Sequence, residues 1–541
     1  MKYLSIASIV LAGGMIMGCS QEDLPNLQPE TPSGNVVIRT ATISMEGEEP
    51  TRALTEHGVK TFEAGDQIAV IYQKTDDFFA KAEATLTDGD ITNDGKSARI
   101  TVTLTNPKTD GIVRYIYPAS LVWDNGNENL DAIYSEQDGT LSKISQNLDY
   151  AKFEGTFNGT ELPKGTLGNQ LAICKFTIKD GEGTDITNQL TRLTIKNGSD
   201  VYFITPSSLD NIWVALRPIS SGNIDIYAAK TWALYKKTVT GNTTLAANTL
   251  TPITVTAPQV EGALSGLFSI NDNHDLAYFS QGNLQAQWDE TNSYWKWMFA
   301  EYQHEYIQND QANVRPKSPE NGKKIDLFGW STVYDFFGIS DSNDDDDYSG
   351  PFFDWGWSNI INGGGNKQWR TPSGSELDYI LNWRISGNPI AGVYAARYIR
   401  VQLGAAGDDI KGIVLFPDHY VLPALEHSTI TWGDVNEENS PGVILHWDDW
   451  GKMEAAGAVF LPAAGFREGD EVTLDWKNYP EGCYWTSSQG SGEGNADDCG
   501  RALEFSKCQI DPDEYSIEME DALRHAGFSV RLIGPWIEPS L

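Results

Sequence analysis

Five aspartates occur in one short segment, Asp341-Ser342-Asn343-Asp344-Asp345-Asp346-Asp347, where they could bind a cation. Its oxygen-bearing side chains stand at alternate positions, as in calcium-binding loops: Asp341, Asn343, Asp345 and Asp347. The sixth position is not glycine and the twelfth is Phe352 rather than Glu, so the segment is not an EF-hand. Clustered carboxylates repel one another unless solvent or a cation screens them. A weak calcium site and a disordered acidic loop therefore both stay open.

A second candidate is a tetrad in which two aromatic side chains flank two acidic ones: Trp447, Asp448, Asp449 and Trp450. An aromatic ring can stack on the apolar face of a sugar while carboxylates accept protons from its hydroxyl groups. The tetrad could thus bind a glycan. The alternative is a solvated loop whose tryptophans pack inward.

The sequence contains none of the common catalytic patterns. Its seven histidines are scattered, with no HExxH or HxH spacing, so no metal hydrolase is indicated. It has no GxSxG, no P-loop and no GxGxxG in a βαβ context. Carboxylate pairs are too abundant for any one of them to indicate a glycosidase. We therefore predict a protein that is not an enzyme and that needs no cofactor, apart from the calcium considered above.

The cysteines are too few for a disulfide scaffold: Cys19, Cys174, Cys483, Cys499 and Cys508. Cys174 lies in an apolar, strand-like run and is predicted to be a buried small hydrophobic residue. The last three form no CxxC pair, which argues against a zinc site among them. One disulfide among these three stays open.

Length and charge restrict the partners and the number of domains. A chain of 541 residues is too long for one hydrophobic core, so two to four domains are expected. The formal net charge of −36 argues against nucleic acid and anionic lipid surfaces as partners, because both would repel the chain.

The N-terminus has the pattern of an export signal. Lys2 precedes an apolar run from Leu4 to Met17, and Gly18-Cys19 follows it. This pattern resembles the lipobox of bacterial lipoproteins, which implies a signal peptide at 1–18, a lipid on Cys19 and an outer-membrane location. Ser20-Gln21-Glu22-Asp23 resembles the signal that exports some lipoproteins to the cell surface. The alternative is an ordinary signal peptide with a chance cysteine. Residues 19–34 contain several prolines and are expected to form a lipidated stalk.

From Asn35 to Pro258 the sequence is typical of an all-β protein, with short β-branched and aromatic runs between Gly, Asn and Asp turns. The count fits two β-sandwiches, at 35–145 and 146–258. Four motifs resemble the fimbrillin (type V pilin) family: Arg52-Ala53, Phe62 to Val70, Tyr115 to Pro118, and Val214 to Pro218. The resemblance implies two transthyretin-like domains and assembly by β-strand exchange with other pilus subunits. It also implies proteolytic cleavage after an arginine. Arg39 and Arg52 are the candidates, and both could equally be ordinary surface residues.

Residues 262–541 are rich in tryptophan and glycine, which favours a compact domain with long ordered loops. We expect a helix near Glu376 capped by Ser373 or Ser375, with Leu377, Ile380, Leu381 and Trp383 on or near its inner face. We also expect a central strand from Ala458 to Leu461, and a final strand with Phe528, Val530 and Leu532 inward and Ser529 and Arg531 on the other side.

The ordered motifs of this part include Phe279 to Gln285, Asp326 to Thr332, Trp369 to Leu377 and Gly482 to Ser488. They resemble the Fibrobacter-type major paralogous domain, a relative of the C-type lectin and formylglycine-generating-enzyme folds. The resemblance implies an α+β, C-type-lectin-like domain. The paired copper-binding cysteines of those enzymes and the calcium motifs of sugar-binding lectins have no match here.

These features predict a mainly β, cell-surface lipoprotein that acts as a fimbrial tip or accessory adhesin. Its partners would be other pilus subunits and an extracellular glycan or host protein, with a lipid anchor in the outer membrane and no nucleic acid. One alternative is a surface glycan-binding lipoprotein that does not polymerise. The other is an enzyme on the formylglycine-generating-enzyme-like scaffold.

Overall fold

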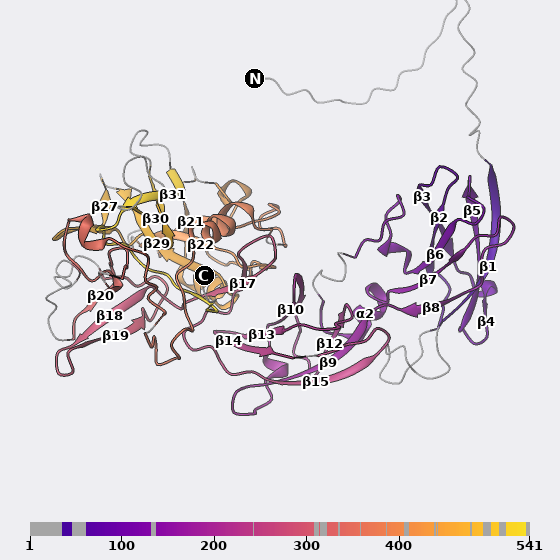
Figure 1. The fold of residues 1–541 in the computed structure, drawn as a ribbon, viewed down its shortest axis with the longest axis horizontal. Helices are drawn as coiled ribbons and strands as arrows, with labels where there is room; N and C mark the ends of the chain where they lie inside the picture. The colour runs from indigo at the N-terminus through magenta and orange to yellow at the C-terminus, as the bar shows by residue number, and fades with distance from the viewer. Residues whose placement is uncertain are drawn as a thin grey trace, which may run out of the picture.

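The computed structural model describes residues 35–45, 61–130, 137–241, 243–307, 313, 322–333, 336–357, 359–385, 387–404, 410–437, 440, 442–476, 479–490, 499–507 and 515–536. Cys19, Arg52 and Cys508 lie outside these ranges. The fold is mainly β, and its three parts follow one another along the long axis of the molecule (Figure 1). Within the described residues, no helix has the length and apolar character needed to cross a membrane.

The first part is one continuous sheet with the order β3-β2-β6-β7-β8-β1-β5-β4. Its strands are β1 Val36–Met45, β2 Gln67–Gln73, β3 Phe79–Thr85, β4 Ile91–Thr92, β5 Ser97–Thr105, β6 Ile112–Tyr117, β7 Ala151–Thr156 and β8 Gly165–Asn169. β1 is an interior strand, antiparallel to β5 and parallel to β8. Its alternating side chains Ala41, Ile43 and Met45 enter the first core.

The first sheet continues past the boundary that we expected at residue 145. β7 pairs with β6, and β8 pairs with both β7 and β1, so the first part reaches Asn169. The strand signals of β7 and β8 are local, whereas their partners lie far away along the chain. Sequence spacing therefore did not indicate which sheet they would join.

The second part has two sheets that enclose a shared core. One has the order β12-β9-β15 and the other β11-β10-β13-β14. Their strands are β9 Ala172–Lys179, β10 Arg192–Asn197, β11 Asp200–Ile204, β12 Ile212–Leu216, β13 Ile224–Lys230, β14 Ala233–Val239 and β15 Leu250–Thr256, and α2 Leu141–Asn147 precedes them. Cys174 is fully buried in this core, as predicted. Ile71, Ile116 and Leu121 of the first part belong to the same cluster, so the two parts pack together.

The third part has several small sheets and a few short helices. Its longer elements are β17 Leu276–Phe279, β18 Leu284–Asp289, β19 Tyr294–Phe299, β21 Tyr398–Leu403, β22 Ile410–Leu415, β23 Val443–Leu445, β24 Val459–Pro462, β29 Gly482–Gln489, β30 Cys499–Lys507, β31 Tyr515–Leu523, α4 Gly374–Asp378 and α5 Trp447–Ala455. Shorter strands are β16 Phe268–Ser269, β20 Lys324–Ile325, β25 Phe466–Glu468, β26 Glu471–Thr473, β27 Asp475–Trp476, β28 Tyr479–Pro480 and β32 Ile533–Gly534. β17 pairs with both β16 and β32, which brings the two ends of this part together.

The helix predicted near Glu376 is present and begins with Ser373 as its N-cap. The Ser373 hydroxyl accepts the N–H of Glu376, whose carboxylate accepts the N–H of Ser373 in return. Leu377, Ile380 and Leu381 are buried as expected. Trp383 is not: it is 69% exposed, because the chain winds into a π-helical turn, Tyr379–Trp383, that rotates it outward.

Two strand predictions need correction. Val459–Pro462 is buried but pairs only with β22, so it ends its sheet instead of lying at the centre. Within residues 528–532, Phe528 and Ser529 form isolated bridges and the rest belong to no strand, and all five side chains are buried. Arg531 donates to Asn283 and Gln303 inside the protein. The two polar residues of this segment are therefore buried and do not form a solvated face.

Candidate functional site

The four residues predicted to bind a glycan, Trp447 to Trp450, form the start of α5. The helix places two of them inside the protein and two towards solvent. Asp449 and Trp450 are buried, and the Trp450 ring packs against Phe460 at 5.7 Å. Asp448 is 72% exposed, and Trp447 is partly exposed. The segment is a helix rather than a loop, and its period places neighbouring residues on different faces. Only Trp447 and Asp448 can contact a ligand from solvent.

Asp449 ties a distant loop to the first turn of α5. Its carboxylate accepts the backbone N–H groups of Glu426 and His427, each at 2.8 Å. Burial opposes its charge, but these bonds, together with those from Ser428, hold the pKa of Asp449 well below its usual range. The ionised carboxylate of Asp449 therefore fixes the position of the His427 backbone.

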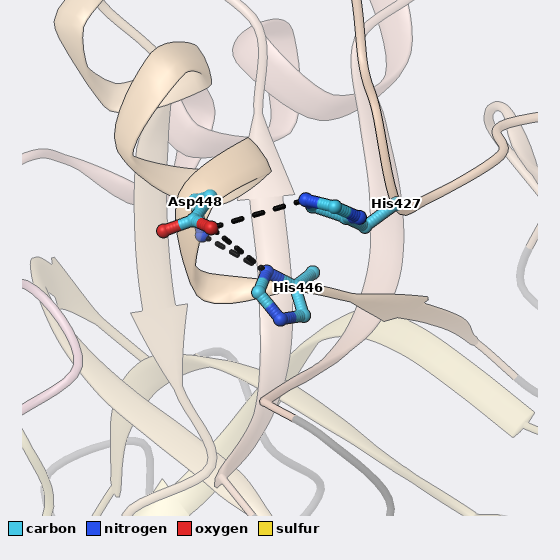
Figure 2. Close-up of side chains that lie close together, drawn as sticks. All are labelled: His427, His446 and Asp448. Carbon is cyan, nitrogen blue, oxygen red and sulfur yellow. Dashed lines mark hydrogen bonds and ion pairs between the residues drawn. The ribbon is translucent and has the colours of Figure 1, made fainter.

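Figure 2 shows three side chains that converge beside this junction: His427, His446 and Asp448. His427 Nε2 lies 3.9 Å from Asp448 Oδ2, and His446 Nδ1 lies 3.7 Å from the same oxygen. The imidazole rings are 4.6 Å apart between centroids. Among the residues that the structure describes, this is the group of His, Cys, Asp and Glu whose donor atoms lie close enough to hold one metal ion.

The spacing of the histidines gave no indication of this cluster. The local part of the signal is His446-Trp447-Asp448, in which an N-capping histidine is followed by an acid in the first helical turn. His427 comes from a separate loop, and only the tertiary contact through Asp449 brings it close. No sequence periodicity encodes such a contact.

A row of aromatic side chains begins at Trp447. The His304 ring packs edge-on against Trp447 at 4.7 Å, and Tyr302 stacks on His304 at 5.5 Å. Tyr302 is 54% exposed. Rings of this kind offer flat apolar surface beside the carboxylate of Asp448, which is the combination expected for binding a sugar.

The aspartate-rich segment does not gather its carboxylates around one point. Asp345 binds His525, accepting its backbone N–H at 3.2 Å and lying 2.9 Å from Nδ1. Asp344 caps the short 3-10 helix Asp345–Tyr348. Among the described residues, Asp341, Asp345 and Asp347 are not a group of three carboxylates close enough to hold one ion, and Asn343 is exposed. The weak calcium site stays a prediction.

A cavity of about 220 Å³ lies beside β29–β31 and is lined by acidic and apolar side chains, among them Glu481, Cys483, Glu504, Leu523 and Phe528. Burial raises the pKa of the Cys483 thiol well above its usual value, and the charges of Glu504 and Glu481 raise it further. Cys483 is thus a poor nucleophile in this state. Cys174 and Cys483 are free thiols and are buried.

Of the two candidate cleavage positions, Arg39 lies inside β1, opposite Val102 of β5. Its guanidinium donates to the carbonyl groups of Ile38 and Gly159 at 2.9 and 3.3 Å. Arg52 lies outside the described residues, in the segment between β1 and β2. The lipidation candidate Cys19 also lies outside them.

A comparison with protein-family models finds no match, and neither does a comparison with curated proteins. The comparison with solved structures returns, among others, one from Bacteroides fragilis described as a cell adhesion protein. It is 15% identical, covers 44% of this chain and 93% of its own, and has a TM-score of 0.25. A similarly named protein of Bacteroides uniformis is 12% identical, covers 41% and 97%, and has a TM-score of 0.26. A streptococcal ancillary pilin is 10% identical, covers 48% and 80%, and has a TM-score of 0.17. At these scores the function has to be argued from the residues of this chain.

Proposed function

We propose that this protein is a cell-surface adhesin subunit. It reaches the outer membrane as a lipoprotein through Cys19, joins other pilus subunits by β-strand exchange, and presents its C-terminal part to an extracellular ligand. The location of β1 carries the proposal. β1 is the first described strand, and it fills the gap between β5 and β8.

The contacts of β1 explain why its release would create a binding groove. Removing it would leave two strand edges without partners and would uncover Ile100, Leu104 and Leu167, each fully buried here. An unpaired edge beside an apolar groove is what an added strand recognises. A second subunit could supply that strand.

Cleavage after Arg52 fits this scheme better than cleavage after Arg39. A protease needs an extended, accessible chain, whereas the backbone of Arg39 is paired in the sheet. A cut after Arg52 would free the whole of β1 and would also detach the lipid of Cys19 from the rest of the chain. Lipidation would then serve transport rather than permanent anchoring.

The ligand surface that we propose is the aromatic row of Tyr302, His304 and Trp447, of which Tyr302 is exposed and the other two partly exposed, together with Asp448. The same helical turn carries Trp447 and Asp448, so one glycan could contact both. This surface belongs to the third part of the chain, at the opposite end of the molecule from β1 (Figure 1).

The strand-exchange part is tested by treating the full chain with an arginine-specific protease and then adding a labelled peptide of residues 35–45. We expect one early cut after Arg52, followed by incorporation of the peptide in place of the endogenous strand. Arg52→Gln should block both, whereas Arg99→Gln, an exposed arginine on β5, should block neither. Cleavage without peptide uptake would contradict strand exchange and favour a surface protein that does not polymerise.

The ligand part is tested separately, by comparing the full chain with its Trp447→Ala variant on an array of glycans and host proteins. We expect binding that the substitution weakens at least tenfold. Trp232→Ala, which removes an exposed tryptophan of the second part, is the matched control. Equal binding by all three proteins would contradict this ligand surface.

A further inference from the structure

The donor atoms of His427, His446 and Asp448 lie close enough together to hold one metal ion (Figure 2). Asp448 Oδ2 is the common point, 3.9 Å from His427 Nε2 and 3.7 Å from His446 Nδ1, and all three donor atoms lie within 4.8 Å of one another. In a tetrahedral zinc site the metal–ligand bonds are about 2.0–2.1 Å, which places neighbouring donor atoms roughly 3.3–3.4 Å apart. The two distances to Asp448 Oδ2 exceed this value by about half an ångström, and the distance between the two histidine donors exceeds it by at most about 1.4 Å, so rotations of the exposed side chains would complete the geometry.

His446 Nδ1 is the acceptor that caps α5, and it accepts the backbone N–H of Asp448 at 3.3 Å. The same nitrogen lies 3.7 Å from Asp448 Oδ2. A metal ion at this point would take the Nδ1 lone pair in place of that N–H, so metal binding would exchange a long capping hydrogen bond for a coordinate bond.

Hydrogen bonds to Asp449, which is buried, and Ser428, which is partly buried, fix the backbone around the three donors. Asp449 holds the N–H of His427, and the Ser428 hydroxyl accepts the N–H of His446 at 2.9 Å. The loop, the end of β23 and the first turn of α5 are thereby held together before any metal arrives. The positive end of the helix dipole disfavours a cation nearby, but the carboxylates of Asp448 and Asp449 in the first turn oppose it.

We propose that His427, His446 and Asp448 form a zinc-binding site on the C-terminal part of this protein. Two imidazole nitrogens and one carboxylate oxygen suit Zn²⁺, whereas Ca²⁺ takes oxygen ligands. The side chains of His427, His446 and Asp448 are 49%, 41% and 72% exposed, so the fourth position faces solvent. Water or an oxygen donor from an extracellular partner would occupy it.

Zinc titration of the metal-free full chain, followed by calorimetry and by equilibrium dialysis, tests this proposal. We expect one Zn²⁺ per chain, with Ca²⁺ unable to compete. Co²⁺ in place of zinc should give the visible absorption bands of a low-symmetry, nitrogen-containing site. Because binding is measured with the metal alone, the result does not depend on strand exchange or on a glycan ligand.

Three substitutions remove one donor each: His427→Gln, His446→Asn and Asp448→Asn. Asn is a favourable N-cap, so His446→Asn keeps the start of α5 while it removes the imidazole. Each should lower zinc affinity at least tenfold with little change in the metal-free melting temperature. His274→Gln, an exposed histidine elsewhere in this part, should bind zinc like the parent chain. Absence of stoichiometric binding, or binding that survives all three substitutions, would overturn the proposal.

Discussion

The buried carboxylate of Asp449 accepts the backbone N–H of His427 at 2.8 Å, and so joins a loop to the first turn of α5. Asp449→Asn should remove at least one of the backbone hydrogen bonds that the carboxylate accepts, because an amide presents N–H groups to a donor. We expect a loss of about 1–3 kcal/mol in the free energy of unfolding. Zinc affinity should fall about 10–100-fold, since residues that position ligands have effects of this size. Denaturant unfolding and zinc titration check the two effects.

Asp449→Asn should also change how the free energy of unfolding depends on pH. The pKa of Asp449 is lowered in the folded protein, so its stabilisation is present above the pKa of the unfolded chain and is lost as the pH falls below that value. The variant should therefore differ most from the parent chain at neutral pH and least under strongly acidic conditions. An equal difference at every pH would contradict the role of the ionised carboxylate.

Substitution in the buried ion pair of Arg384 and Asp418 should also strongly lower the free energy of unfolding. Arg384 Nη1 lies 2.7 Å from Asp418 Oδ1 with both side chains almost fully buried, and Asp418 Oδ2 also accepts the N–H and hydroxyl of Ser269. Asp418→Ala would leave the guanidinium charge without its partner and should cost about 3–5 kcal/mol. Glu471→Gln, at an exposed position, should change stability by less than about 0.5 kcal/mol. Chemical denaturation measures both variants.

The second and third parts of the chain are coupled through Arg192. Its guanidinium donates to the carbonyl groups of Asp418 and His419 at 2.8 and 2.7 Å, and Phe203 packs on the His419 ring at 4.0 Å. Arg192→Met should weaken this contact by roughly 1.5–3 kcal/mol and separate the thermal unfolding of the two parts. Arg217→Met, whose guanidinium lies 3.8 Å from Asp200 at the surface, is the control. A single unchanged calorimetric transition would argue against the coupling.

The acidic cavity should make stability depend on pH near neutrality. Burial, aided by Glu481, Glu520 and Glu518, raises the pKa of Glu504 to about 7. The folded state then keeps a proton that the unfolded chain has already released. This stabilisation is complete below the ordinary pKa of a glutamate and is lost as the pH rises towards 7.

Glu504→Gln should flatten the fall in stability between about pH 5 and 7, by at most about 1.4 kcal/mol per pH unit for one proton. Denaturation at several pH values measures the slope. Glu468→Gln, an exposed carboxylate that lines the same cavity, should leave the slope unchanged. If both variants keep the parental slope, Glu504 does not hold the proton.

Strand β1 should contribute to stability through only one of its faces. Ile43 is fully buried, whereas Ile38 is 66% exposed on the same strand. Ile43→Ala should cost about 2–5 kcal/mol through lost contacts and a cavity, and Ile38→Ala close to nothing. Ile43→Ala should also speed the peptide exchange proposed above, because the endogenous strand would be held less firmly. Similar effects of the two substitutions would show that β1 does not seal the first core.

The sequence by itself determined the features that depend on local physics. Alternating β-branched runs specify strands, an apolar run places Cys174 in a core, and Ser373 with Glu376 specifies the start of a helix. Each of these signals lies within a few neighbouring residues, so reading along the chain is sufficient to find it.

Only the tertiary structure decided which distant residues meet. It brought His427 to His446 and Asp448, turned Asp449 inward to hold them, and inserted β1 between β5 and β8. Pairing of distant segments depends on the packing of whole sheets and on buried hydrogen bonds, and neither leaves a periodic trace in the sequence. The tetrad at the start of α5 illustrates the difference. Its composition indicated a ligand site, but the helix and its packing separated Trp447 and Asp448, which reach solvent, from Asp449 and Trp450, which are buried.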